Sequence, residues 1–467
     1  MPVLTRVAPK FCPILDPDFL PASLWNRCFR ATVEESGKAN PLGIALERAD
    51  GSISVFRTAV LPHEGSNLAS NERYVERLLK FLLWQKGGYR VWIGGDPGIA
   101  RFLEGVYSPT GRRAFDVQFM GNQVYGRALA VQHTGYDQLP TEHEAVAPLG
   151  RHLEGCRIGF DLGASDRKCA AVVDGEVVFS EEVPWDPSRQ ADPQYHFDGI
   201  NDSLKRAAAK LPRVDAIGGS AAGVYVNNEV RVGSLYRAVP QNLFDSRVRR
   251  LFFELQEAWR GVPFEVVNDG EVTALAGSMA LNDNAVLGIA FGSSLAAGYV
   301  TPQGNITGWL NELAFVPIDY RENAPADEWS GDQGVGALYF SQQAVGRLLP
   351  AAGIALPNHM PLAAKLVEVQ KLMAAGDGRA RRIYQTIGTY LGYGIAHFAD
   401  FYEIRNLLVL GRVMTGEGGD IILSVAGEVL REEFPELAGV IRVHIPGETE
   451  KRHGQAVAAA SLPSLKK

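Results

Sequence analysis

Two apolar strands in this sequence each run directly into a short turn rich in glycine and serine. The first strand covers residues 157–163 and its turn ends at Ser165, whereas the second covers residues 285–291 and turns at Gly292. Glycine lets a backbone approach a ligand closely, and successive N–H groups in such a turn can surround an anion. Two turns of this kind can hold a polyphosphate from both sides. The pair therefore favours a fold in which two similar units face one another.

The chain after residue 157 alternates between short apolar runs and amphipathic runs, which is typical of α/β proteins. The order of three strands followed by helix, strand, helix, strand and helix can be read twice and is that of a ribonuclease-H-like unit. We therefore expect two such domains around a nucleotide cleft, at residues 156–283 and 284–467. The predicted strands are 157–163, 168–174, 176–183, 214–219, 264–268, 285–291, 296–300, 406–410 and 440–444. The predicted helices are 197–211, 247–260, 271–281, 336–349, 362–375, 379–402, 417–434 and 453–461.

Residues 1–155 precede these units as an α/β extension of uncertain role. A hairpin at 43–60, a helix at 72–86 and a strand at 89–95 are expected there.

The extension repeats part of the later pattern at one offset of 124 residues, which relates Asp50-Gly51 to Asp174-Gly175. A degenerate copy of the same half-unit explains this match, and so does coincidence among common turn pairs. If the region is a copy, Gly37 stands where Asp161 would be, and the copy lacks that carboxylate.

The first turn carries Asp161, Gly163 and Ser165. A carboxylate at the end of a buried strand can hold a hydrated Mg²⁺, while the glycine lets backbone N–H groups reach phosphate oxygens. An ordinary polar turn is the alternative for this motif taken singly. The motif gains weight from Gly292 and Ser293 in the second turn, and from Gly411, where an apolar strand opens into a glycine-rich segment that could border an adenine ring.

Asn268 and Asp269 end an apolar strand directly before a helix. The plain interpretation is a helix N-cap and turn. Beside a nucleotide, Asp269 can instead accept the proton of an alcohol that attacks the γ-phosphate, since positioning and charge supply most of the catalysis of phosphoryl transfer.

The order of these motifs, together with Gly218–Gly223 and the run from Asn311 to Ala314, resembles the ROK family of bacterial sugar kinases and sugar-responsive repressors, within the actin-like ATPase superfamily. The resemblance covers residues 157–462. It implies ATP and Mg²⁺ as cofactors, a sugar or polyol as partner, and Asp269 as the catalytic base. It further assigns Asp161, Gly163, Ser165, Gly292, Ser293 and Gly411 to the nucleotide, with Asp161 on Mg²⁺, and Asn268 and Glu312 to the sugar.

The acceptor side departs from the family pattern. Phe315 replaces a sugar-contacting histidine, Ala337 stands where a sugar-binding glutamate is common, and residues 331–337 have no cysteine where the family carries a zinc segment. No zinc site is expected, and the acceptor is either unusual or lost.

A net charge of −7 without any Lys/Arg tract argues against nucleic acid as a partner. No window approaches 18 continuous apolar residues, and the first residues lack the core of a signal peptide, so a cytoplasmic protein without a membrane partner is expected. The leading hypothesis is a Mg·ATP-dependent sugar or polyol kinase. A non-catalytic nucleotide- or sugar-binding regulator or scaffold on the same fold is the alternative, and homodimerisation stays open.

Overall fold

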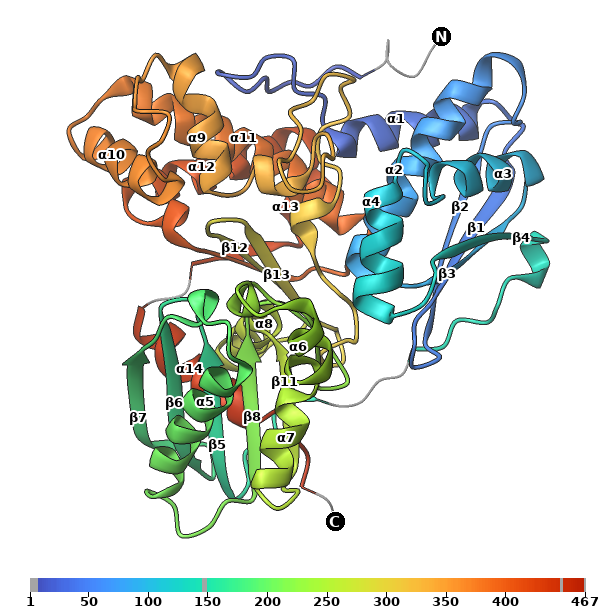
Figure 1. The fold of residues 1–467 in the computed structure, drawn as a ribbon. Helices are drawn as coiled ribbons and strands as arrows, with labels where there is room; N and C mark the ends of the chain where they lie inside the picture. Colours follow the sequence, from blue (N-terminus) through green and yellow to red (C-terminus); the bar gives the residue numbers. More distant parts are fainter. Residues whose placement is uncertain (1–6, 145–148, 446–447, 466–467) are drawn as a thin grey trace.

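The computed structural model describes residues 7–144, 149–445 and 448–465, the last segment with its side chains from residue 454 onward. Within these residues the strands form three larger sheets and one two-stranded hairpin, and helices cover the sheets (Figure 1). The α/β class and the two ribonuclease-H-like units expected from the sequence are confirmed. No helix in the described part of the chain combines the length and apolar character needed to cross a bilayer.

The first unit is built on a five-stranded sheet of order β11-β8-β5-β6-β7. Its central strand β5 pairs antiparallel with β6 and parallel with β8. Phe160, Phe252 and Phe264 belong to a core that this unit keeps to itself. The elements are β5 (Cys156–Leu162), β6 (Asp166–Val173), β7 (Glu176–Pro184), α5 (Pro193–Ala208), β8 (Ala216–Ala221), β9 (Val224–Val226), β10 (Glu229–Val232), α6 (Gln241–Ser246), α7 (Leu251–Ala258), β11 (Phe264–Asn268) and α8 (Asp269–Leu281).

The last helix, α14 (Glu448–Ala460), returns to the first unit and packs against β5, β6 and β8. A Cβ atom on Gly159 would lie 2.1 Å from the carbonyl oxygen of Ala456, and one on Gly218 would lie 1.9 Å from that of Ala459. These two glycines therefore allow the helix backbone to lie directly on the sheet. The boundary expected at residue 284 groups this helix with the second unit, although it covers the sheet of the first.

The second unit has a four-stranded sheet of order β13-β12-β14-β15. The helix expected over residues 336–349 divides into a 3₁₀ turn, Gly336–Leu338, and a helix that begins at Gln342, because Ser341 is extended and its hydroxyl accepts a hydrogen bond from the Gln343 N–H at 3.0 Å. The elements are β12 (Val286–Phe291), β13 (Leu295–Val300), α9 (Gln342–Ala352), α10 (Leu362–Ala374), α11 (Gly378–Ala399), β14 (Asn406–Leu410), α12 (Glu417–Glu433), α13 (Pro435–Ala438) and β15 (Arg442–His444).

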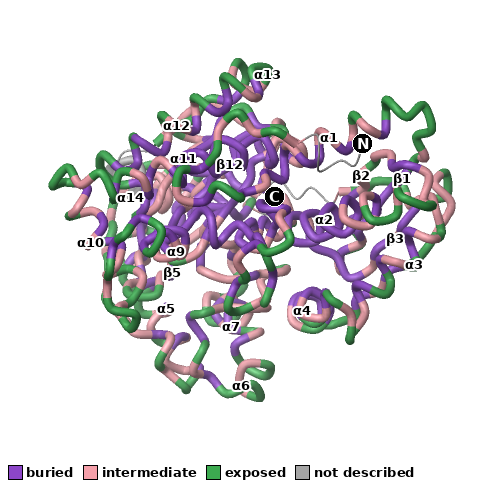
Figure 2. Tube along the Cα trace, turned by 90° about the horizontal axis from the view of Figure 1, so that it is seen from above, coloured by how far each residue is buried: buried purple, intermediate pink, exposed green. Residues whose placement is uncertain are grey.

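The N-terminal region shares its hydrophobic core with the second unit. The Phe81 and Phe401 rings, for example, stack with their centroids 3.7 Å apart. Helix α2 is mostly buried and lies between the N-terminal sheet and the second unit (Figures 1 and 2). The elements are α1 (Ala22–Glu35), β1 (Asn40–Glu47), β2 (Ile53–Val60), α2 (Leu68–Lys86), β3 (Arg90–Gly94), α3 (Pro97–Val106), α4 (Ala114–Asp116), a π-helix (Val117–Tyr125) and β4 (Ala130–Thr134).

The N-terminal sheet, of order β2-β1-β3-β4, has the same strand arrangement as the sheet of the first unit except that one strand is missing. Strands β1, β2 and β3 occur in the same chain order as β6, β7 and β8, and β3 runs antiparallel to β1 and parallel to β4. In the first unit β5 separates β6 from β8, whereas β1 and β3 pair directly. Gly37, the position equivalent to Asp161, lies just after α1 rather than in a strand. The strand order thus agrees with the interpretation as a degenerate copy, but the N-terminal sheet has no counterpart of β5.

Candidate functional site

Asp161 lies at the end of β5, where the first turn begins. Its carboxylate accepts a hydrogen bond of 2.5 Å from the Ser220 hydroxyl on the neighbouring strand β8. The Lys168 ammonium stands 3.8 Å from Asp161 and 3.3 Å from Asp166. Burial raises the pKa of Asp161, against the opposing effects of Ser220 and Lys168. The sequence did not assign Ser220, although it follows the paired glycines of β8.

The first turn itself is a tight hairpin that projects Ser165 into solvent. The Gly163 N–H donates to the carbonyl oxygen of Asp166 at 3.0 Å, and the indole N–H of Trp185 donates to the Gly163 carbonyl at 2.8 Å. The Ser165 hydroxyl donates to the Asp166 carboxylate at 2.9 Å. These hydrogen bonds fix the turn and leave Ser165, at its tip, exposed.

The second turn and Gly411 are brought together by the parallel pairing of β12 with β14. A Cβ atom on Gly411, whose φ is +104°, would lie 2.5 Å from the carbonyl oxygen of Phe291, the residue before Gly292. The Gly292 carbonyl in turn accepts from the Gln342 N–H at 2.9 Å at the start of α9, and Ser293 is exposed. These three predicted nucleotide residues thus form one edge of the second unit.

Asp269 is the first residue of α8, and Asn268 is its N-cap. The side-chain oxygen of Asn268 accepts from the Gly270 N–H at 2.7 Å, and its amide donates to the Gly223 carbonyl at 2.7 Å. Asn268 therefore ties the helix start to the loop after β8, which is the plain role considered for it. Whether it also contacts a sugar stays a prediction.

Glycines let the start of α8 lie against β13 of the second unit. A Cβ atom on Gly298 would lie 2.1 Å from the Gly270 carbonyl oxygen, and one on Gly270 would lie 2.2 Å from the Ala297 carbonyl. This contact joins the helix that carries Asp269 to the strand that leaves the second turn.

The carboxylates of Asp161, Asp269 and Glu312 are linked electrostatically in sequence, Asp161 to Asp269 and Asp269 to Glu312. Burial, and then the charge of Asp161, raises the pKa of Asp269 to about 6. Burial, and then the charge of Asp269, raises the pKa of Glu312 to about 7. Asp269 and Glu312 are only half-buried by surface area, so they lie deep in a region that solvent still reaches. The fold thus gathers residues from β5, α8 and the loop before residue 313 at one place.

Glu312 is positioned from the N-terminal region. Its N–H donates to the carbonyl oxygen of Trp84 at 3.0 Å, and the N–H of Asn311 donates to that of Gln85 at 2.9 Å. These are carbonyls of the last turn of α2, which helix geometry leaves without intrahelical partners. The N-terminal region therefore holds the backbone at Glu312, the residue predicted to contact the acceptor.

Asn311 has a left-handed backbone, with φ of +50°. Its amide donates to Glu271, and its side-chain oxygen accepts from the Tyr402 hydroxyl at 2.8 Å. Burial raises the pKa of Glu271 to about 8. This buried network holds the residue next to Glu312 in a conformation that asparagine tolerates well.

A buried cluster of charges connects α2 to the loop at residues 331–334. The Lys80 ammonium is fully buried, lies 2.8 Å from an Asp116 oxygen and also pairs with Asp332. The Arg113 guanidinium pairs with Asp332 and, at 2.5 Å, with Glu76. We refer to these five residues as the buried ion cluster. They are more than 90% buried, so the cluster depends on every partner being present.

Phe315 and Ala337, the departures noted in the sequence, are both packed by apolar neighbours. The Phe315 ring centroid lies 4.4 Å from that of Trp84 and 5.1 Å from that of Trp329, which is 54% exposed. Ala337 is buried in the second unit. Aromatic rings therefore pack against Phe315, which is close to Glu312 in the sequence and stands where the family pattern has a sugar contact.

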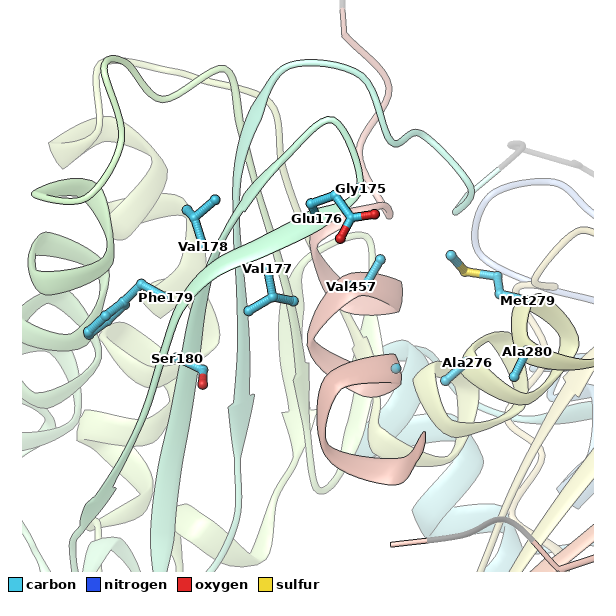
Figure 3. Close-up of a pocket in the computed structure, with 11 residues that line it drawn as sticks. Gly175, Glu176, Val177, Val178, Phe179, Ser180, Ala276, Met279, Ala280 and Val457 are labelled. Carbon is cyan, nitrogen blue, oxygen red and sulfur yellow. The ribbon is translucent and has the colours of Figure 1, made fainter. Parts of the chain in front are cut away.

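One cavity is lined by a predicted site residue, and a second lies elsewhere. A cavity of about 280 Å³ is lined by Asp161 and Lys168. Another of about 660 Å³ lies between β7, α8 and α14, where Val177, Met279 and Val457 line it (Figure 3). This second hollow includes none of the predicted site residues.

The donor set fits a metal ion that arrives with a nucleotide. Mg²⁺ is commonly held by one or two carboxylates, substrate phosphates and water. Asp161 offers a carboxylate beside the phosphate-type turn. Among the described residues, no three His, Cys, Asp or Glu side chains are grouped so that they could hold a metal ion by themselves.

No protein-family profile matches the chain, and no curated protein matches its sequence. Solved structures do match. A ROK hexokinase from Thermus thermophilus aligns with a TM-score of 0.52 and 19% identity over 65% of this chain and 97% of that one. A ROK-family transcriptional regulator described as a homologue of E. coli MLC aligns at 0.53 and 19% identity, over 78% and 88% of the two chains. A glucokinase from Parabacteroides distasonis aligns at 0.50 and 14%, over 66% and 98%.

At these identities the likeness concerns the fold. The chain has the fold that these ROK proteins share, as the resemblance of its motifs implied. Both sugar kinases and a regulator share this fold, so the function must be argued from the site.

Proposed function

We propose that this protein is a Mg·ATP-dependent kinase that transfers the γ-phosphate to a hydroxyl group of a sugar or related polyol. The observation that supports the proposal best is the electrostatic link from Asp161, at the end of the strand before the first turn, to Asp269, and from Asp269 to Glu312. In addition to burial, Asp161 raises the pKa of Asp269, and Asp269 raises that of Glu312, so three parts of the chain would supply carboxylates to one site.

Asp269 is suited to act as the general base. A base is most effective when its pKa lies near the working pH, and burial raises the pKa of Asp269 to about 6. Its deprotonated carboxylate would accept the proton of the attacking hydroxyl. The contacts of Asn268 with Gly270 and Gly223 fix the start of α8, so the carboxylate keeps one orientation.

The nucleotide would lie between the two turns. Gly163 and Ser165 would approach the phosphates from the first unit, Gly292 and Ser293 from the second, and Gly411 would border the adenine. Asp161 would hold Mg²⁺, which neutralises charge on the transferring phosphoryl group when bound. Lys168 would add a positive charge at the same turn.

Glu312 would orient the acceptor through its hydroxyl groups. The Glu312 N–H donates to the Trp84 carbonyl oxygen, and the Phe315 ring packs against the Trp84 ring, so the acceptor would be bounded by a carboxylate and by aromatic side chains. This arrangement supports a polyol that also carries apolar surface.

The test is an assay of ADP release with Mg·ATP over a broad panel of sugars and polyols, with product identified by mass spectrometry. Replacement of Asp269 by Asn should lower kcat by about 10²–10⁴-fold, the usual contribution of a general base, while ATP binding stays within threefold. Asp245→Asn, at an exposed carboxylate of α6, is the control and should keep full activity. Absence of any phosphorylated product, or full turnover by Asp269→Asn, would refute the proposal.

A non-catalytic nucleotide- or sugar-binding regulator is the second candidate. The apolar packing around Phe315 and Ala337 favours it, and a regulator shares the fold. Calorimetry separates the two functions, because a regulator would bind ATP or sugar without acceptor-dependent ADP release.

A further inference from the structure

A cavity of about 480 Å³ lies at the interface between the N-terminal region and the second unit. Its walls come from α1, α2, α3, the segment before α4, and the loop at residues 321–333. None of the residues assigned to the nucleotide or the acceptor lines it. Four of its lining residues are arginines: Arg73, Arg77, Arg112 and Arg321.

The arginines are not equally neutralised. Arg321 pairs with Asp16 at 2.6 Å and with Asp319 at 2.9 Å, so its charge is balanced. Glu76, which also lines the cavity, pairs at 2.5 Å with Arg113 of the buried ion cluster. Arg77 and Arg112 reach the same Glu76 only at 3.6 and 4.0 Å. One carboxylate therefore serves three guanidinium groups.

Arg73 forms no ion pair with any described carboxylate. Its guanidinium carbon lies 5.7 Å from the centre of the Trp25 ring. Burial, and then the charge of Arg77, lowers the pKa of Arg73, against the weaker opposing charges of Glu322 and Glu76. The other two lining carboxylates, Glu72 and Glu322, have no ion pair with it, and Glu322 is exposed. The cavity thus contains a half-buried cation that lacks a hydrogen-bonded counter-ion.

Two further features favour an anion in this cavity. Trp25 is 1% exposed and lines it, and its indole N–H has no hydrogen-bond acceptor among the described residues. Ala69 and Ser70, in the first turn of the 19-residue helix α2, also line it, and that turn carries no acidic residue. A helix N-terminus adds partial positive charge at such a place.

We propose that this cavity binds a small phosphate ester, with its phosphate held by Arg73, Arg77 and Arg112 and its organic part against Trp25. Guanidinium groups pair with phosphate oxygens in a bidentate manner, and a doubly charged phosphate matches several arginines better than a single carboxylate does. A volume of about 480 Å³ accommodates a ligand the size of a phosphorylated monosaccharide.

A ligand in this cavity would connect helix α2 of the N-terminal region with the loop at residues 321–333. Arg77 donates to the Gln333 carbonyl at 3.1 Å, next to Asp332 of the buried ion cluster. A ligand that bridges α2 and the loop at 321–333 would therefore hold the loop in place and stabilise the folded protein in proportion to its concentration.

The test is calorimetric titration of the full chain with inorganic phosphate, glucose 6-phosphate and malonate. A non-hydrolysable ATP analogue is present throughout, since phosphate could also enter the cleft. Glucose 6-phosphate should bind and raise Tm. Arg73→Met should weaken binding by at least tenfold, because a charge-assisted bond to phosphate is lost, and Arg73→Lys should recover part of it. Arg382→Met, at a half-buried arginine of α11 away from the cavity, should bind within twofold of the wild type.

Other outcomes would overturn the proposal. It fails if no phosphate compound binds, if malonate binds as well as glucose 6-phosphate, or if Arg73→Met binds normally. Should Arg73→Met fold poorly, the exposed Arg112→Met serves instead and should still weaken binding. Because Arg73 lies outside the cleft, the result stands whether or not the chain phosphorylates a sugar.

Discussion

The first unit has a hydrophobic core of its own, whereas the N-terminal region and the second unit share one core. The two turns predicted to hold the nucleotide, one in each unit, are short local hairpins whose tips at Ser165 and Ser293 are exposed. Glu312, predicted to contact the acceptor, and its neighbour Asn311 are instead held by carbonyls of α2 from more than 200 residues earlier in the chain. Each predicted phosphate turn is thus formed by residues close together in the sequence, whereas the position of Glu312 depends on packing between distant segments.

Two lysines, each beside two carboxylates, show the same difference between a buried and an exposed environment. Lys80 is fully buried between Asp116 and Asp332, whereas the Lys168 side chain is 39% exposed beside Asp161 and Asp166. Loss of a buried partner leaves uncompensated charges, while exposed pairs are screened by water.

Replacement of Lys80 by Met should therefore give the largest effect on stability, a loss of about 3–5 kcal/mol in the free energy of unfolding. Lys168→Met is the matched control and should cost less than about 1 kcal/mol. Urea denaturation of both variants measures the difference. Equal losses of stability in the two variants would show that the buried and the exposed lysine do not differ in this way.

Gly298→Ala should have the next largest effect, about 1–3 kcal/mol, because the new Cβ would lie 2.1 Å from the Gly270 carbonyl oxygen. The displaced start of α8 should also lower kcat through Asp269. Gly308→Ala, where a Cβ meets nothing within 4 Å, is the control for thermal unfolding and activity. A neutral Gly298→Ala would show that the contact between α8 and β13 is not tight.

The smallest expected effect is a pH dependence. Since the pKa of Asp269 is raised to about 6, the base becomes protonated below that pH, and kcat/KM should fall about tenfold per pH unit from pH 6 downward. The free energy of unfolding, measured over the same range, distinguishes titration of the base from acid unfolding. A rate that stays constant down to pH 5 would exclude Asp269 as the base with this pKa.

Much of the fold could be predicted from sequence periodicity. The helix expected at 362–375 is α10, and the strand expected at 406–410 is β14. The π-helix Val117–Tyr125 and strand β4 were not predicted. Gly121 and its polar neighbours interrupt the helical pattern of apolar residues, and tertiary packing stabilises this helix. A Cβ on Gly121 would lie 2.7 Å from the Arg127 carbonyl, which shows how closely the chain returns there.

The candidate site divides in the same way. Asp161, Gly163, Gly292 and Asp269 could be recognised because each lies where an apolar strand ends, a local signal. Lys80, Asp116 and Asp332 gave no such signal, since each is an ordinary charged residue until folding buries it.

The sequence by itself determined the alternation of strands and helices, the two glycine-rich turns and the order of the motifs, because these depend on neighbours a few residues apart. Only the tertiary structure decided that α14 covers the first unit, that α2 holds Glu312, and that arginines of the N-terminal region meet the loop at 321–333. Those features depend on burial and charge pairing between distant segments, and no local pattern encodes which segments will meet.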